Sequence, residues 1–236
     1  FSVVYQPIKT TSAGDTFSYV IMDGEATSEE SDIVVSAHAD EVAKPLTGNT
    51  GYALKFDGED DEAQFGSYAA YGLGAGATFG MWFKTLSHAH GATLLSAGPY
   101  TLAWDKVQGL QFAVGDAVVS NSKAYNDGHW HYVVAAFDGQ AAYLTVDDDQ
   151  AVAAGVAPPA GGSGAVTLGA AAGSPGFFGG EVDEFVIFAS DAHDLLRSVE
   201  WSGKCSSSTY GCFTSADTGL KGYWKFNDSH GSALAS

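Results

Sequence analysis

The chain is poor in basic residues. Its 236 residues include 10 Lys and Arg against 28 Asp and Glu, which gives a formal net charge of −18 at pH 7. A protein of this charge repels phosphate backbones and anionic lipid surfaces, so the composition argues against nucleic acid as a partner. The acidity is typical either of a highly soluble surface or of a set of divalent-cation sites.

Long apolar runs are absent from the sequence. No stretch approaches the roughly 18 apolar residues of a membrane-spanning helix, so no membrane insertion is expected in this segment. The chain begins at Phe1 without an initiator Met, a charged leader or an apolar leader. We therefore expect any signal peptide to be absent or already removed.

Cysteine is scarce as well. Cys205 and Cys212 are separated by six residues in the run C-S-S-S-T-Y-G-C. A loop rich in Ser and Gly lets them meet, while the spacing is too long for a C-x-x-C redox pair and no Cys or His pair nearby completes a zinc set. We predict a disulfide and an oxidising, extracellular location. The sequon at Asn227 predicts a glycosylation site, which agrees with secretion.

Proline is scarce, whereas glycine and aromatic residues are plentiful. The chain has 30 Gly, 6 Pro and 13% aromatic residues, a composition typical of a β-rich protein with many turns. Two β-prone runs within residues 127–149 meet at Asp138-Gly139, a strong hairpin signal that places His131, Val133 and Ala135 on the core face. Asp147, Asp148 and Asp149 are then expected to end the second strand in solvent. Further short strands at regular spacing predict an all-β antiparallel sandwich.

Three motifs resemble laminin G-like domains of the concanavalin A-like lectin and glucanase superfamily. Gly128 to Val133 with Phe137 to Gly139 is similar to that family's signature hairpin. The segment Ala53 to Asp61 resembles its opening strand, and Phe177 to Phe188 resembles its closing strand. The resemblance covers residues 51–200 and implies a β-sandwich of the jelly-roll type.

The flanking residues predict parts of further modules. Residues 1–38 resemble the last hairpin of an immunoglobulin-like or cadherin-like repeat, and they are too few to bury a sandwich core alone. Either this hairpin docks on the next domain or the chain before it is missing. Residues 39–50 are predicted to form a linker. Residues 201–236 are predicted to form a disulfide loop and the first strand of a following laminin G-like module. For that strand, within 219–228, the alternative is a core strand of the same sandwich.

A tight acidic turn is the candidate metal site. Asp57, Asp60 and Asp61 lie close together in sequence, and hard cations such as Ca²⁺ take carboxylate and carbonyl oxygens as ligands. In the resembling family this corner lies next to the closing strand, which here carries Asp183. The resemblance implies that these four residues bind a structural Ca²⁺ that holds the first strand to the last. The alternative is a solvated acidic turn.

Three functions from different classes stay open. The first is a structural or adhesive module of a large repetitive extracellular protein, such as a surface filament, appendage or matrix protein, in contact with neighbouring modules or copies of itself. The second is glycan binding. Aromatic residues that stack on sugars in lectin-like relatives are its candidates, with core packing as the alternative for each. These candidates are Tyr100, Trp104, Tyr125 and Trp130.

A glycoside hydrolase is the third function. The glucanase pattern of the superfamily resembles E-x-D-x-x-E, and Glu181 and Asp183 fit its first two positions. The third position falls on Val186, an apolar residue. The sequence therefore predicts a protein that is not an enzyme.

Overall fold

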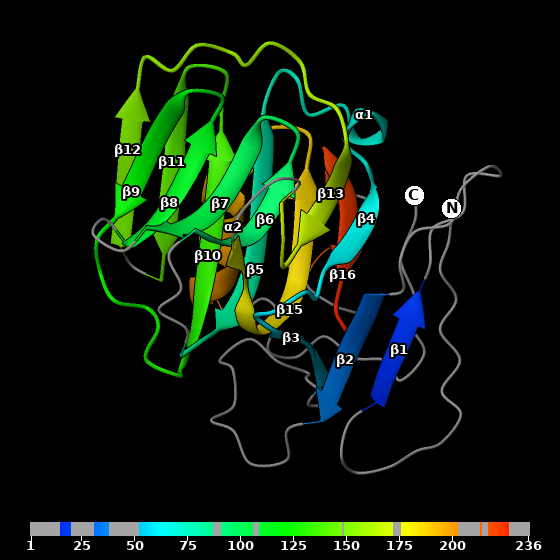
Figure 1. Cartoon of the computed structure of the whole chain (residues 1–236). Coiled ribbons are helices and arrows are strands. Elements are labelled where there is room, and N and C mark those ends of the chain that lie inside the picture. Colours follow the sequence, from blue (N-terminus) through cyan, green and yellow to red (C-terminus); the bar gives the residue numbers. More distant parts are fainter. Residues whose placement is uncertain are drawn as a thin grey trace, which may run out of the picture.

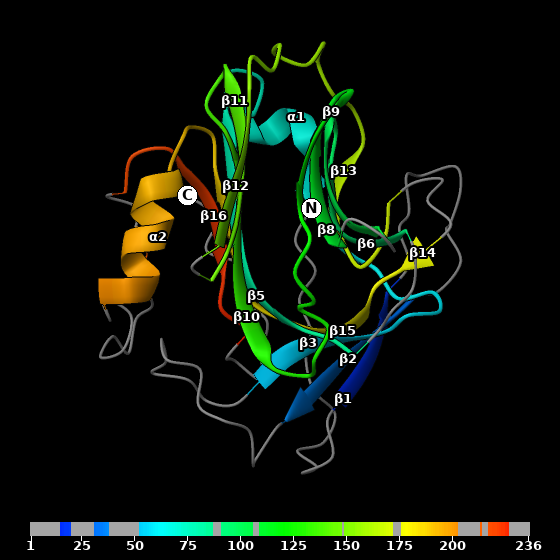
Figure 2. The same cartoon turned by 90° about the vertical axis from the view of Figure 1, so that its left-hand side faces the viewer.

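The structure is a computed structural model in which residues 15–19, 31–37, 52–86, 91–105, 109–147, 149–171, 176–202, 213 and 217–226 are described. These residues form two β-sheets that face each other, with a short helix at one end and a longer one outside (Figures 1 and 2). The predicted all-β sandwich is confirmed. Every described strand pairing is antiparallel except that of β14 (Gly176–Phe177) with β6 (Ala92–Ala97).

The larger sheet has nine strands. In spatial order they are β1 (Asp15–Tyr19), β2 (Ser31–Ala37), β3 (Tyr52–Asp57), β15 (Gly179–Phe188), β5 (Ala77–Lys84), β10 (Trp130–Phe137), β11 (Ala141–Val146) and β12 (Asp149–Ala154), with β16 (Leu220–Trp224) also paired to β15. The smaller sheet has seven strands, and β14 pairs with its β6 outside the main order. That main order is β4 (Ala63–Ser67), β13 (Ala165–Leu168), β6, β7 (Tyr100–Asp105), β8 (Gly109–Val114) and β9 (Ala117–Asn121).

The predicted hairpin at Asp138-Gly139 joins β10 to β11. Phe137 pairs with Ala142, so the loop between them has four residues. Gly139 takes a positive φ of 99°, a backbone region that favours glycine. The Asp138 carboxylate accepts the N–H groups of Gln140 and Ala141, both at 2.7 Å. A local sequence signal therefore sets the register of two central strands.

Apolar side chains fill the space between the sheets, and a second cluster lies outside the larger sheet. Helix α1 (Tyr68–Tyr71) covers one end of the sandwich, and α2 (His193–Ser202) lies against the outer face of the larger sheet (Figure 2). The outer cluster under α2 consists of Trp82, Tyr132, Val134, Val186, Phe188, Ala192, Leu196, Phe213 and Tyr223. The larger sheet is therefore covered on both faces over part of its width.

A bulge in β15 keeps an acidic residue out of the core. Asp183 pairs with Trp82, but the next pair is Val186 with Gly80, so β15 holds an extra residue here. Glu184 takes a positive φ of 54° at this point. Without the bulge, strict alternation would point Glu184 toward the other sheet. With it, Glu184 accepts a hydrogen bond from the Tyr223 hydroxyl on the outer side.

Both flanking segments belong to the larger sheet. Strand β2 pairs with β3, and β1 pairs with β2. The N-terminal hairpin therefore docks on the sandwich, which is one of the two arrangements that the sequence left open. Strand β16 pairs with residues 185–188 of β15, while β3 pairs with residues 179–182 along the same strand. Residues 220–224 thus form a strand of the larger sheet, which fits the alternative prediction for this segment.

Candidate functional site

The acidic turn after β3 brings three predicted metal ligands together. Carboxylate oxygens of Asp57, Asp60 and Asp61 lie within 4.8 Å of one another. The Asp57 carboxylate accepts the N–H of Glu59 at 2.7 Å, and Asp61 accepts the N–H of Asp57 at 2.9 Å. These bonds fold the turn so that its side chains converge. Three carboxylates at this spacing fit the oxygen-rich ligand set of a hard cation.

This turn also lies beside the closing strand, as expected. Asp57 pairs with Gly179 of β15. A Cβ on Gly58 would lie 3.2 Å from the Gly179 Cα, so glycine lets the two backbones approach closely. Asp61 is 2% exposed, while Asp57 and Asp60 are exposed to solvent.

The structure does not bring Asp183 to this turn. Asp183 lies four residues beyond Gly179 along β15, which is about 13 Å at the usual rise per residue. It pairs with Trp82 on the outer side of the sheet and is fully buried, where it accepts the N–H of Glu184 at 2.8 Å. The prediction for Asp183 as a ligand beside Asp57 is wrong, because the register of β15 places a glycine at that corner.

Two of the four aromatic candidates for glycan binding are core residues. Tyr100 is fully buried, and its hydroxyl donates to the Leu73 carbonyl at 2.9 Å. Trp104 is 8% exposed and stacks on Phe178 with ring centres 6.1 Å apart. They alternate with half-buried residues along β7, so their side chains point between the sheets. Neither ring is accessible to a sugar.

The other two candidates differ in exposure. Tyr125 is 4% exposed, and its ring packs edge-on against His131 with centres 5.1 Å apart. Trp130, at the start of β10, is half-buried and has the Lys84 ammonium 5.9 Å from its ring centre. Of the four candidates, only Trp130 is partly exposed, and it packs against the outer apolar cluster.

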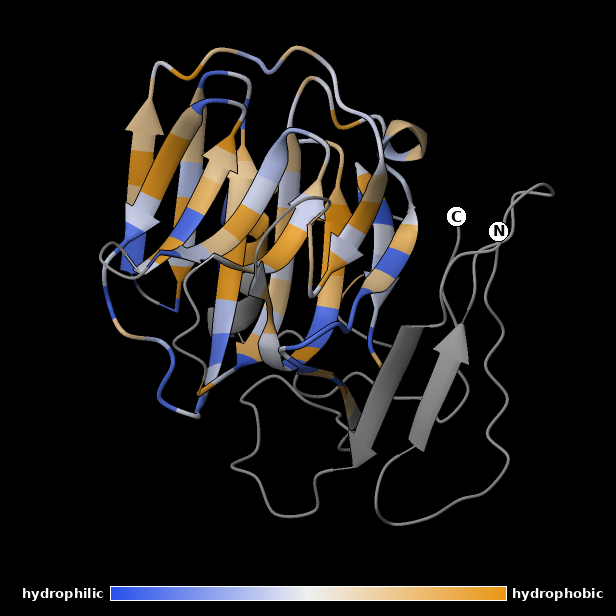
Figure 3. Cartoon of the chain, viewed as in Figure 1, coloured by the Kyte–Doolittle hydropathy of each residue, from blue (hydrophilic) through white to orange (hydrophobic). Residues whose placement is uncertain are grey.

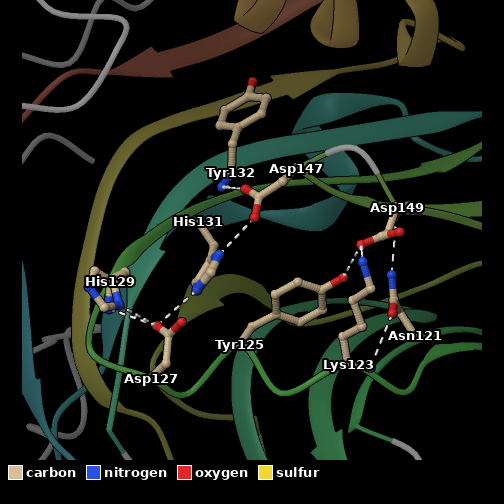
Figure 4. A network of polar contacts seen from close by, with 9 residues as sticks. All are labelled: Asn121, Lys123, Tyr125, Asp127, His129, His131, Tyr132, Asp147 and Asp149. Atoms are coloured by element: carbon tan, nitrogen blue, oxygen red, sulfur yellow. Dashed lines mark hydrogen bonds and ion pairs between the residues drawn. The ribbon is translucent and has the colours of Figure 1, made fainter.

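A polar network around His131 lies beside Tyr125 (Figure 4). His131 Nδ1 is 2.7 Å from Asp147 Oδ2, and Nε2 is 3.1 Å from Asp127 Oδ1. Asp147 Oδ1 accepts the N–H of Tyr132 at 3.0 Å. Further along, Asp149 accepts a bond from Lys123. The network therefore joins the loop before β10 to the turn between β11 and β12.

Only part of this network can be predicted from local sequence patterns. His131 does face the core side of β10, as the hairpin pattern predicts, and its ring centre is 5.6 Å from that of Phe83. Asp147 and Asp149 were expected to end a strand in solvent, but they bind His131 and Lys123. No spacing rule links residues 127, 131 and 147, because the hairpin fold alone brings them together.

The charge of His131 depends on its two carboxylate neighbours. Burial disfavours the charged ring, but hydrogen bonds and attraction from Asp147 and Asp127 outweigh it, and the pKa of His131 is raised. Burial likewise opposes ionisation of Asp127, but the N–H of His129 and the His131 ring lower the pKa of this carboxyl. The two carboxylates therefore favour the protonated form of the His131 ring over the neutral form.

This arrangement predicts a pH-dependent stability. The raised pKa of His131 means that its contribution is complete below the unfolded value of about 6.5 and is lost as pH rises through the folded value. For Asp127 the contribution is complete above about 3.9 and is lost as pH falls through the lowered value. We expect His131→Gln to lower the urea midpoint more at about pH 5.5 than at about pH 9.

A matched variant separates charge from packing in this experiment. His129→Gln removes a ring that is 73% exposed in the same loop, and its effect on the midpoint should be small at both pH values. If His131→Gln lowers the urea midpoint by the same amount at both pH values, the charge of His131 adds no stability. The ring would then stabilise the fold only through packing against Phe83 and Tyr125.

Several predicted site residues lie outside the described residues. They are Cys205, Cys212, Asn227 and Asp148. The disulfide and the glycosylation site therefore stay predictions. Among the helices that the structure describes, none has the length and apolar character needed to cross a membrane.

Two facing antiparallel sheets, closed by strands from both flanks, define a lectin-like sandwich module. A laminin G-like family model described as the concanavalin A-like lectin/glucanases superfamily matches residues 57–192, more than half of the chain. The chain belongs to this family. A search among curated proteins found no match.

Solved structures with a similar fold come from proteins of diverse kinds. A mutant Trypanosoma rangeli sialidase displaying trans-sialidase activity aligns with a TM-score of 0.54 and 19% identity, over 75% of this chain and 30% of the sialidase. Domains LG4-5 of the mouse laminin alpha1 chain align with a TM-score of 0.45 and 18% identity, over 69% and 44%. The chain thus spans less than half of each protein, and the sialidase likeness shows the fold alone.

Proposed function

We propose that this segment is a non-catalytic structural or adhesive module of a larger extracellular protein. The main support for this proposal is that three of the four aromatic residues that could bind a glycan are packed in the core. Tyr100, Trp104 and Tyr125 belong to the core cluster between the sheets. Membership of a family of binding modules supports a role in contacts rather than chemistry, and family members typically occur outside the cell.

The surroundings of the two strand carboxylates also favour a non-catalytic role. Glu181 lies 4.0 Å from the Lys84 ammonium, and its side chain is 9% exposed. Asp183 and Val186 are both fully buried in the same strand. A retaining glycosidase needs two carboxyl groups that flank a bound sugar, which requires an accessible cleft. These residues instead support the packing of β15 against its neighbours.

Glycan binding is the second candidate function, and one observation favours it. The partly exposed Trp130 ring beside the Lys84 ammonium offers an apolar surface and a hydrogen-bond donor at one place, a combination suited to holding a pyranose. A glycan array probed with the whole chain tests this alternative. Retention that Trp130→Ala removes and the surface control Leu86→Ala preserves would establish the lectin function, whereas no retention on any glycan supports the structural role.

We further propose that Ca²⁺ binds at the turn formed by Asp57, Asp60 and Asp61. A bound cation would relieve repulsion between these carboxylates and hold β3 against β15 at the Asp57–Gly179 pair. A ligand that binds only the folded state stabilises it by about 2.7 kcal/mol at a hundredfold excess over its Kd. We therefore expect excess chelator to lower the melting temperature by several degrees.

Two variants make this measurement specific. Asp57→Asn combined with Asp60→Asn should abolish the response of the melting temperature to added Ca²⁺ and to chelator. Asp116→Asn, an exposed acidic residue in the turn between β8 and β9, should leave the response intact. An unchanged melting curve of the native chain in chelator would contradict a stabilising Ca²⁺ at this turn.

A further inference from the structure

Helix α2 covers an apolar part of the outer face of the larger sheet (Figure 2). Strand β10, which α2 contacts, is hydrophobic over its later half (Figure 3). Residues 132–137 of this strand are all buried, so side chains on both of its faces are covered. A Cβ added to Gly80 of β5 would lie 2.9 Å from Leu196 Cδ1, so the helix packs directly on the sheet. Detachment of α2 would therefore expose apolar side chains to water.

A buried histidine begins this helix. His193 is the first residue of α2 and is 5% exposed. Its ring stacks on that of Tyr143 in β11, with ring centres 4.8 Å apart. The Nε2 atom lies 3.2 Å from Thr145 Oγ1 in β11 and 2.8 Å from Gln150 Nε2 in β12. The imidazole therefore lies between the start of the helix and two strands of the larger sheet.

The contacts of the His193 ring favour its neutral form. The amide nitrogen of Gln150 only donates hydrogen bonds, so Nε2 of His193 is the acceptor and carries no proton. The single ring proton is then on Nδ1, which lies 3.5 Å from Asp194 Oδ1. A doubly protonated ring would bring two donors together at Gln150, unless the amide turned over.

The charged groups on the helix side do not compensate for burial of the ring. The carboxylates of Asp194 and Asp191 favour a charged His193, but Asp194 is 96% exposed and Asp191 is also in solvent, where water screens their attraction. The Arg197 guanidinium acts against the charged ring, as does the positive end of the helix dipole. Burial is the largest influence, and it lowers the pKa of His193.

The strands packed against α2 bring no charge into contact with the ring. In β11 the ionisable group beside His193 is Tyr143, whose hydroxyl donates to Asp138 Oδ2 at 2.9 Å. Strand β12 presents the neutral Gln150. Strand β10 presents Tyr132 and Val134 to the apolar cluster under the helix. A proton on His193 would therefore be a poorly compensated buried charge.

We propose that protonation of His193 in mild acid releases α2 from the larger sheet and exposes the outer apolar cluster. In the released helix the ring is in water, where its pKa has the ordinary value of about 6.5. The docked ring has a lowered pKa, so the released state binds the proton more readily. Docking is therefore strongest above about pH 6.5 and weakens as pH falls, until the docked ring is itself protonated.

This effect is opposite in sign to that of His131, whose stabilising contribution is lost as pH rises. Acid therefore strengthens the network around His131 on the core side of β10 and weakens the docking of α2 on the outer side. A local measurement at α2 is needed to separate the two histidines.

Hydrogen exchange of the whole chain, followed by mass spectrometry and corrected for the intrinsic exchange rate at each pH, tests the proposal. We expect the protection of the α2 amides to fall about threefold or more between about pH 7.5 and about pH 5, because each unit of lowered pKa corresponds to a tenfold change in opening. The amides of β10 and β11 should keep their protection, since the helix opens without the sandwich.

Two variants assign this response to His193. His193→Gln keeps a neutral hydrogen-bonding side chain, and His193→Phe keeps a ring beside Tyr143, but neither takes up a proton near pH 6. Both should remove most of the loss of protection in acid, and the comparison of two pH values within each variant cancels any effect of the substitution on docking itself. His131→Gln is the control and should leave the acid response of α2 intact.

Three results would overturn the proposal. Protection of the native α2 amides that is unchanged by acid means that the helix does not respond to pH. An equal acid response in the native chain and in both His193 variants assigns the effect to another group. Equal loss of protection in α2, β10 and β11 means that the whole domain opens rather than the helix alone.

An NMR titration of the native chain tests the same inference without depending on the folding of a variant. The ring signal of His193, assigned by its absence from the spectrum of His193→Gln, should titrate below about 6.5. Titration at or above this value contradicts the proposal, because docking would then favour the protonated ring. Neither experiment involves glycan or Ca²⁺, so the inference stands or falls independently of the function proposed above.

Discussion

Trp224→Ala is expected to destabilise the whole sandwich by about 3 kcal/mol, a value typical of removing a large aromatic ring from a core. The Trp224 ring stacks on Phe185 with centres 5.3 Å apart, and Phe65 of β4 packs edge-on against it at 4.9 Å. These three rings join β16, β15 and the edge of the smaller sheet. Loss of the indole would leave a gap at the side where the two sheets meet.

The measurement for Trp224 is the urea midpoint with its slope. Lys221→Ala, an exposed change in the same strand, should shift the free energy of unfolding by less than about 0.5 kcal/mol. An unchanged midpoint for Trp224→Ala would mean that residues 220–224 do not complete this sandwich. The residues would then fit the other prediction, the start of a separate module.

Tyr100→Ala should cost still more, about 4 kcal/mol, because the ring is fully buried. It stacks on Phe112 with centres 6.1 Å apart and also packs against Phe79 at 5.6 Å. Tyr100→Phe keeps the ring but leaves the Leu73 carbonyl without its donor, at a cost of about 1 to 2 kcal/mol. Both values are read from urea denaturation of the purified variants.

This pair of variants separates a core role from a ligand role. Truncation of a residue that only served a binding site would reduce ligand retention by the protein and leave the stability of its fold unchanged. We expect the reverse for Tyr100, with a low midpoint and no specific change in retention by any glycan. Leu86→Ala, at an exposed position, is the control for an ordinary surface change.

Sequence alone predicts the parts of this fold that local signals specify. Asp138-Gly139 fixes a hairpin because the turn residues and the alternation of β10 and β11 agree within a short stretch. The acidic turn at residues 57–61 is similarly local, and three of its carboxylates do converge. In both cases the residues that matter are neighbours in the chain.

Other features depend on how distant strands align, which composition and spacing do not encode. Asp183 was assigned to the acidic turn, but the register of β3 on β15 pairs Asp57 with Gly179 instead. The bulge at Glu184 has no sequence signature, since a glutamate in a strand reads as an ordinary exposed position. Tyr100 is a glycan-binding candidate by residue type, yet it lies in a strand whose alternate residues fill the core.

The position of β15 has a consequence for how the molecule folds. Its partners on one edge are β3, from early in the chain, and β16, from near residue 224, so this central strand acquires its neighbours only after very different lengths of polypeptide have been made. Contacts so far apart in sequence require large loops to close before any gain is realised, and folding of such topologies takes about milliseconds to seconds. During synthesis the aromatic side chains of β15 therefore stay uncovered until β16 emerges, and apolar surface exposed in this way is prone to aggregation.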